Sequence, residues 1–402
     1  MTATEEFGKI QRHVIVGDGI TAAAFADGLN LKAGDELVVI GDHATQLGRG
    51  IAYAEGDKNA PWYNAYLLNS PADDIDPKFA RWLEENWTRL APRMEGRKPD
   101  WLGAAQALLE RGDIYGLNAP RSFYGEFMQE QVANLLDELG EKEVSVSLID
   151  DRALSIDQEN DMLMIATERN STIAANSADV APGGPSTQRF PGDNGPHSAP
   201  TLFGNEERIA EHIHSGAEIL CVGANATMLD ALRLCQSLVE ESKLNFVACS
   251  PNGSLPPALI PRLPRVLTQP SLTDGHETAQ DLLDEIALTM EDARTRGHEM
   301  REIRAGFRAY FVENGLNRFL KNDQEARKIP KVLRHWLRGG TNDTIRDLRR
   351  FVDEGKCRIM KGGVQEIRST GDHAQVLLRD SDGQTHLYDT FFVINCACAG
   401  PV

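Results

Sequence analysis

The residues with the clearest chemical potential form a short turn near the N-terminus. Gly17 and Gly19 follow the apolar run Val14 to Val16 and precede an alanine-rich segment that begins at Ala22. This is the G-x-G-x-x-G/A pattern, in which a buried strand ends in a glycine turn and backbone amides at the start of a helix bind a pyrophosphate. The alternative is a tight strand-to-helix turn that binds no ligand, because glycine permits such a turn in either case.

A ribose-binding acid is expected at the end of the next strand, about twenty residues after the turn. That strand is predicted over 36–40, and Gly41 occupies the position where the acid should stand. Asp42, one residue later, is the candidate substitute. Its alternative role is that of an ordinary turn residue.

A third candidate is Arg49, which lies between Gly48 and Gly50 in a segment that continues to Tyr53. Permissive backbone around a guanidinium group suits a loop that approaches a phosphate or the edge of a flavin.

Few side chains could react without a cofactor. The six cysteines include no Cys-x-x-Cys pair, so a disulfide relay is not supported, and Cys396 and Cys398 are expected to be structural. His212 and His214 lie in a helical pattern and would point to different faces, which is poor geometry for a metal site. Any catalysis must therefore depend on a bound cofactor.

The elements that position these residues follow from periodicity. Short alternating strands over 144–180 predict a β-meander that crosses over the first sheet. The stretch 188–203, rich in Pro, Gly and Asn, predicts a domain boundary. A second strand and glycine turn follow at 217–223, residues 282–350 are predicted to be mainly helical, and strands resume after 357.

Four stretches carry a family resemblance: GDGITAA from Gly17, GRGIAY from Gly48, LLNSPA from Leu67 and PRSFYGEF from Pro120. In this order they resemble the signature of a bacterial family of FAD-dependent, FAD/NAD(P)-binding oxidoreductases with a glutathione-reductase-like fold. The resemblance implies an α/β fold with four parts. These are a Rossmann-like FAD-binding domain with a β-meander (1–190), a second Rossmann-like domain (191–270), a helical insertion (271–352) and a return to the second domain and the FAD domain (353–402).

The same resemblance implies FAD as the cofactor and NAD(P)H as a candidate second one. The implied contacts are Gly17, Gly19, Ile20, Thr21 and Ala22 for the pyrophosphate, Asp42 for the adenosine ribose, and Arg49, Gly50 and Asn69 for the pyrophosphate or the isoalloxazine ring.

Several positions depart from the family pattern at expected ligand contacts. Asn225 stands where the second turn usually has a glycine, and its side chain would occupy space that a pyrophosphate needs. Pro251 and Asn252 replace arginines that could hold the 2′-phosphate of NADP, and Pro182 replaces a threonine-like residue. His335 is a weak catalytic candidate, with a structural histidine as the favoured alternative. The sequence also ends before the family's C-terminal segment.

Composition sets further bounds. A chain of 402 residues favours about two domains, and a net charge of −18 argues against a nucleic-acid partner. No apolar run has the length of a membrane span, and the polar N-terminal stretch lacks a signal peptide, so a cytoplasmic protein without a membrane partner is expected. The oligomeric state and the small-molecule substrate have no signal in the sequence.

Two functions remain open. The first is an FAD-binding oxidoreductase that performs flavin hydride or oxygen chemistry on a small molecule, with NAD(P)H as a candidate donor. The second is a non-catalytic or truncated scaffold that binds FAD or another nucleotide. The intact first turn favours the first function, and the altered positions elsewhere favour the second.

Overall fold

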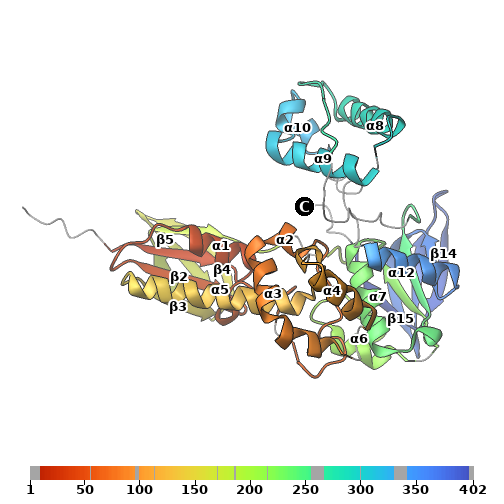
Figure 1. The fold of residues 1–402 in the computed structure, drawn as a ribbon, viewed down its shortest axis with the longest axis horizontal. Helices are drawn as coiled ribbons and strands as arrows, with labels where there is room; N and C mark the ends of the chain where they lie inside the picture. Colours follow the sequence, from red (N-terminus) through yellow and green to blue (C-terminus); the bar gives the residue numbers. More distant parts are fainter. Residues whose placement is uncertain are drawn as a thin grey trace, which may run out of the picture.

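The computed structural model describes residues 10–54, 56–95, 99–112, 114–169, 171–184, 187–214, 216–254, 267–298, 300–329 and 342–397. Figure 1 shows two sheet-containing units at opposite ends of the molecule, with helices between them and a further group of helices standing apart.

The first unit is built on a parallel sheet with the strand order β3-β2-β1-β7. Its strands are β1 (Arg12–Val16), β2 (Glu36–Gly41), β3 (Ser145–Asp150) and β7 (Ser177–Val180). Helices α1 (Ile20–Gly28) and α5 (Arg121–Glu141) pack on one face. The buried alanines of α1 allow it to approach this face closely, where Ile15 and Val39 contribute to the same core.

The opposite face carries a three-stranded antiparallel meander, as predicted. It consists of β4 (Ala153–Glu159), β5 (Met162–Thr167) and β6 (Thr172–Ala175), and Ile165 and Ala175 pack against Val14 and Val38 of the parallel sheet. The meander begins later than predicted, because residues 145–150 form a parallel strand of the main sheet. The alternating pattern of β3 arises because this strand lies at the sheet edge, where its burial is incomplete.

Short helices follow β2 and lead to the start of α5. They are α2 (Ala72–Ile75), α3 (Pro77–Leu90) and α4 (Pro99–Glu110), with 3-10 turns at η1 (Ala44–Gln46), η2 (Ala91–Met94) and η3 (Ile114–Gly116). Asp76 is the N-cap of α3, and its side chain accepts a hydrogen bond from the Lys78 amide. An aromatic core that includes Phe79, Phe123 and Phe127 joins these helices to α5.

The second unit has a parallel sheet with the order β11-β10-β9-β15-β8. The strands are β8 (Ser198–Ala199), β9 (Ile219–Val222), β10 (Phe246–Ser250), β11 (Cys357–Lys361) and β15 (Phe392–Asn395). One face packs against α6 (Glu206–His212), α7 (Ala226–Leu238) and α12 (Asn342–Asp353). The other packs against an antiparallel sheet of β12 (Gly363–Thr370), β13 (His373–Arg379) and β14 (Thr385–Thr390). A 3-10 turn, η4 (Glu241–Lys243), precedes β10.

Two features of this unit correct the sequence-based organisation. Residues 353–402 are predicted to return to the second domain and then to the FAD domain, but the described strands of this stretch all belong to the second unit, where β15 pairs in parallel with β9 and β8. Residues 342–352 were assigned to the helical insertion, but Leu348 and Phe351 of α12 lie in the core of the second unit. In both cases the apolar pattern of the segment would suit more than one position in the fold. The pattern therefore could not show which sheet β15 joins or which core α12 packs against.

The remaining helices are α8 (Ala279–Thr295), α9 (Met300–Asn314) and α10 (Asp323–Ala326), with η5 (Asn317–Phe319). They stand apart from both sheets in Figure 1 and share a separate core around Leu282, Phe307 and Phe319. Thr278 begins α8 with a capping box closed by Asp281. None of the helices in the described ranges combines the length and apolar character that a membrane span requires.

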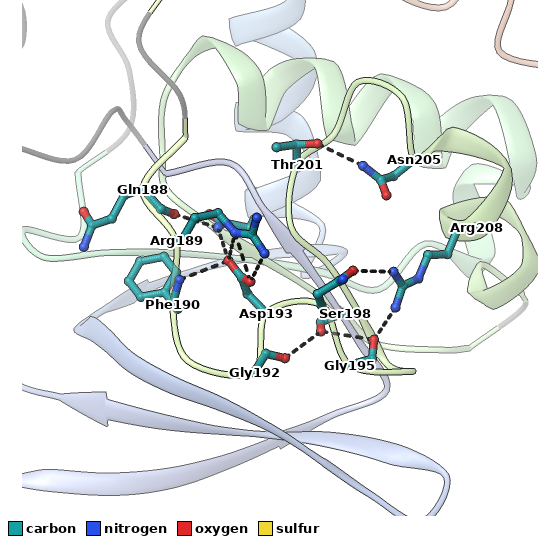
Figure 2. A network of polar contacts seen from close by, with 12 residues as sticks. Gln188, Arg189, Phe190, Gly192, Asp193, Gly195, Ser198, Thr201, Asn205 and Arg208 are labelled. Atoms are coloured by element: carbon teal, nitrogen blue, oxygen red, sulfur yellow. Dashed lines mark hydrogen bonds and ion pairs between the residues drawn. The ribbon is translucent and has the colours of Figure 1, made fainter. Parts of the chain in front are cut away.

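The predicted boundary at 188–203 is an ordered linker. Figure 2 shows the guanidinium of Arg189 on the carboxylate of Asp193, at 2.9 Å from Nε and 2.7 Å from Nη2. Asp193 also accepts from the Phe190 amide at 3.0 Å and from Asn395 of β15 at 3.2 Å. Burial acts to raise the pKa of Asp193, but these hydrogen bonds outweigh it and hold the pKa below its usual value. The linker is therefore tied to the second sheet by a buried carboxylate.

Candidate functional site

The first glycine turn joins β1 to α1, and its first glycine is fixed by packing. Gly17 has φ +120°, and an added Cβ would lie 2.1 Å from the carbonyl oxygen of Ala181 after β7. Its amide donates to the carbonyl of Ile40 at 2.7 Å. Only glycine fits here, because any side chain would collide with the backbone of the neighbouring strand.

Gly19 is different, because its surroundings are open. It is the N-cap residue of α1, with φ −82° and ψ −173°, and makes no side-chain cap. Among the described residues, no atom lies within 4 Å of the position that a Cβ on Gly19 would take. The start of α1 is thus open on the side of Gly19, where Thr21 is exposed and Ile20 is half-buried, whereas Ala22 is buried. An open helix start after a glycine turn is a geometry that can bind a pyrophosphate.

The loop around Arg49 lies directly on this turn. The Gly48 amide donates to the Asp18 carbonyl at 2.9 Å, and a Cβ on Gly50 would be 3.3 Å from the Cα of Gly19. The Arg49 side chain, however, is only 3% exposed, and its guanidinium donates to Gln129 of α5. The backbone next to Arg49 therefore contacts the glycine turn, whereas the guanidinium group binds α5.

Asn69 lies in a bend that leads into α2. The segment before it is held by the start of α5, since the Leu68 amide donates to Ala119 at 2.8 Å and Leu67 forms a bridge with Pro120. Ile20, the first residue of α1, packs against the core that contains Leu67. The structure thus brings three of the four family-like stretches to the start of α1.

The fourth stretch joins them through a close contact. A Cβ on Gly125 of α5 would lie 2.4 Å from the carbonyl oxygen of Tyr53, so α5 can pass Tyr53 only with glycine at this position. The Tyr53 and Tyr124 rings meet edge to face at 5.1 Å.

The predicted ribose acid, Asp42, is engaged elsewhere. Its carboxylate pairs with Arg152, at 2.8 Å from Nη2 and 3.2 Å from Nε. The hydrogen bond from Arg152 lowers the pKa of Asp42, so this carboxylate is ionised and occupied. Both side chains are more than half exposed.

The second glycine turn, between β9 and α7, has a backbone like that of the first turn. It differs because a side chain of the turn caps the first amides of α7. Gly223 has φ +111°, and a Cβ there would lie 2.7 Å from the Cys396 carbonyl. Asn225 is the N-cap of α7, with φ −131° and ψ −168°, so it does not use the left-handed conformation. Its side-chain oxygen accepts from the amides of Thr227 and Met228 at 2.9 and 3.3 Å. Amides that would bind a phosphate are therefore already bonded to Asn225.

The described cysteines, together with His212 and His214, lie in packed surroundings. Cys221, Cys235, Cys249, Cys357 and Cys396 are free and buried, and burial raises the pKa of Cys249 to about 11 and of Cys357 to about 12. His212 stacks on Phe392 at 4.4 Å, and His214 lies 4.6 Å from Phe391. Within the described ranges no group of three His, Cys, Asp or Glu side chains could hold a metal ion. His335 and Cys398 lie outside these ranges.

Sequence reasoning missed two polar groups in this region. Asp18, between the two glycines of the first turn, directs its carboxylate to the end of β2, where the His43 amide donates to it at 2.7 Å. Arg121 of α5 forms a buried ion pair at 2.7 Å with Asp230 of α7 and so links the two units. The glycine at position 41 is the sequence signal for the position of the Asp18 carboxylate. The ion pair of Arg121 with Asp230 depends on packing between distant segments and has no such signal.

Comparisons with known proteins match the part of the chain that contains the first glycine turn. Residues 14–185 match the family model described as FAD-NAD(P)-binding, which confirms the resemblance for this part of the chain. No curated protein matches the sequence. Among solved structures, the FAD-bound cadaverine monooxygenase DfoA from Erwinia amylovora has a TM-score of 0.51 at 10% identity, covering 97% of this chain and 78% of its own. The ornithine N-hydroxylase of Kutzneria sp. 744 has a TM-score of 0.47 at 12% identity, with coverages of 97% and 81%. At these identities the likeness to DfoA shows the fold alone.

Proposed function

We propose that this protein, whose residues 14–185 form an FAD-NAD(P)-binding domain, is a flavoprotein oxidoreductase that binds FAD at its first glycine turn. The observation that carries the proposal is the contrast between the two turns. Gly19 leaves the start of α1 open, whereas Asn225 caps the start of α7 with its own side chain.

In this proposal the turn from Gly17 to Ala22 holds the pyrophosphate through backbone amides, and Gly50 and Asn69 border the same ligand. A bound flavin supplies hydride-transfer and oxygen chemistry, while the protein binds it, orients it and excludes water. The substrate is a small molecule, the protein is cytoplasmic, and neither nucleic acid nor membrane is a partner. The acidic net charge of −18 supports the exclusion of nucleic acid.

The second candidate function is a non-catalytic scaffold that binds FAD or another nucleotide. The capped turn at Asn225 supports this alternative, because a nicotinamide cofactor would have to displace Asn225 from the amides of α7 before using that site.

FAD binding is tested by titrating FAD into the purified protein and following flavin absorbance, flavin fluorescence and the melting temperature. Gly19→Ala places a methyl group in the open space without a clash with the described residues, so the variant should fold normally while FAD affinity falls by more than about tenfold.

Gly28→Ala, at the other end of α1, is the matched control, because a Cβ there also meets open space but lies away from the turn. A colourless protein whose absorbance and melting temperature do not respond to FAD would refute the proposal.

Anaerobic mixing of the FAD-loaded protein with NADH or NADPH separates the two functions. An oxidoreductase that accepts electrons from these donors bleaches its flavin, whereas a scaffold binds FAD and keeps its colour.

A further inference from the structure

The end of β2 has no acidic side chain of its own, yet a carboxylate lies there. A Cβ added to Gly41 would stand 2.7 Å from the Cβ of Asp18 and 2.8 Å from its Oδ2. The Asp18 side chain therefore fills the space into which a side chain at position 41 would project. A side chain at position 41 would collide with Asp18, so glycine at position 41 leaves room for the Asp18 carboxylate at the end of β2.

The Asp18 carboxylate is held in a defined orientation. Its Oδ2 accepts from the His43 amide at 2.7 Å, and the residue is half-buried beside the open helix start at Gly19. A carboxylate has two oxygens that each accept more than one hydrogen bond, so this contact leaves capacity for hydroxyl donors. Asp42 is less suited to this role because Arg152 occupies its carboxylate through two hydrogen bonds.

We propose that Asp18 is the residue that binds the adenosine ribose hydroxyls of the dinucleotide. This proposal rests on the proposed binding of FAD at the first turn. It assigns the ribose contact to Asp18 in the turn and not to Asp42 after β2. A negative carboxylate at this place accepts hydrogen bonds from a free 2′-hydroxyl and repels a 2′-phosphate. The site should therefore select nucleotides with an unmodified ribose.

The test compares two identical substitutions at neighbouring carboxylates. Asp18→Asn keeps an oxygen that can accept from the His43 amide but removes the charge, and we expect FAD to bind about tenfold more weakly. Asp42→Asn should leave FAD affinity within about twofold of the wild type, because it changes only an exposed ion pair. Thermal melts of both variants establish that they are folded.

A ligand-side experiment gives a readout that a structural role for Asp18 would not move. ADP and 2′-deoxy-ADP compete with FAD for the wild-type protein, and ADP should compete more strongly. In Asp18→Asn this preference should shrink, whereas in Asp42→Asn it should remain.

Three outcomes would overturn the assignment: equal competition by the two nucleotides in the wild type, an unchanged preference in Asp18→Asn, or loss of the preference in Asp42→Asn. Failure of the wild type to bind FAD at all would instead refute the proposed function, so the two failures are distinguishable.

Discussion

At Gly17 an added Cβ would collide with the Ala181 carbonyl, whereas at Gly19 it would meet open space. The first glycine is therefore needed by the fold alone, and a ligand-free turn would need it as well. Gly19 has an extended backbone that any residue can adopt, and no atom of the described residues lies within 4 Å of the position of an added Cβ, so these residues give no steric reason for glycine there. Under the proposed function, the reason is the close approach of the FAD pyrophosphate to the backbone at Gly19.

The sequence pattern predicted the turn but not the acid beside it. The spacing rule placed a carboxylate near position 41 and named Asp42, since the rule follows strand length alone. Which way Asp18 points depends on the backbone of the turn, and the pairing of Asp42 with Arg152 joins residues that are 110 positions apart. The only sequence signal for the orientation of Asp18 is the distant glycine at position 41, and the pairing of Asp42 with Arg152 has no local sequence signal.

The buried pair of Asp230 and Arg121 predicts a pH dependence of stability. Burial raises the pKa of Asp230 from 3.8 to about 6, although the charges of Arg121 and Arg233 act to lower it. The folded state therefore holds the Asp230 proton more tightly than the unfolded state between about pH 4 and pH 6, and the contribution of this group to stability falls as pH rises through that window.

Denaturant unfolding of the wild type and Asp230→Asn, measured at intervals from pH 4 to pH 7, checks this prediction. Asparagine does not titrate, so the unfolding free energy of the wild type minus that of the variant should decrease as pH rises. An increase would mean that the arginine charges outweigh burial and that the pKa of Asp230 is lowered.

At the scale of single elements, the start of α7 depends on one side chain. Asn225 bonds two helix amides and also donates to the Cys396 carbonyl at 2.8 Å, so it connects α7 with the end of β15. Asn225→Ala should lower the free energy of unfolding by about 1–2 kcal/mol, as for other lost N-caps. Asn225→Ser, which restores a capping oxygen, should recover much of this loss. Equal stability of all three proteins in urea denaturation would show that the side chain does not cap the helix.

The elements themselves were predictable to different degrees. The strand at 36–40 and the meander could be predicted because apolar runs and strict alternation are local signals. The pairing partners of β3 and β15 could not, because a short buried strand such as β15 fits any parallel sheet with an open position. Strand order depends on contacts between distant segments, and one sequence contains no direct information about them.

The whole molecule repeats one architecture twice. The order β3-β2-β1-β7 with a meander on one face corresponds to β11-β10-β9-β15 with β12, β13 and β14 on one face. In the first unit the connection from β2 to β3 contains α2, α3 and α4, and in the second unit the connection from β10 to β11 contains α8, α9 and α10. This repetition explains why β15 belongs to the second sheet: it completes that sheet as β7 completes the first. Within this common frame, the difference between the open helix start at Gly19 and the capped helix start at Asn225 supports our proposal that FAD binds to the first unit.

The helices α8 to α10 form a third body with its own core, which predicts local unfolding independent of the cofactor site. Phe307 is 1% exposed in that core, so Phe307→Ala should destabilise these helices by about 3–5 kcal/mol. Hydrogen exchange should then speed up in α8 and α9 while α1 and β1 keep their protection and FAD affinity is unchanged. Val312→Ala is the control, because Val312 lies on the same helix and is 81% exposed. If Phe307→Ala instead accelerated exchange equally in β9 and β10, the helices would be part of one cooperative unit with the second sheet.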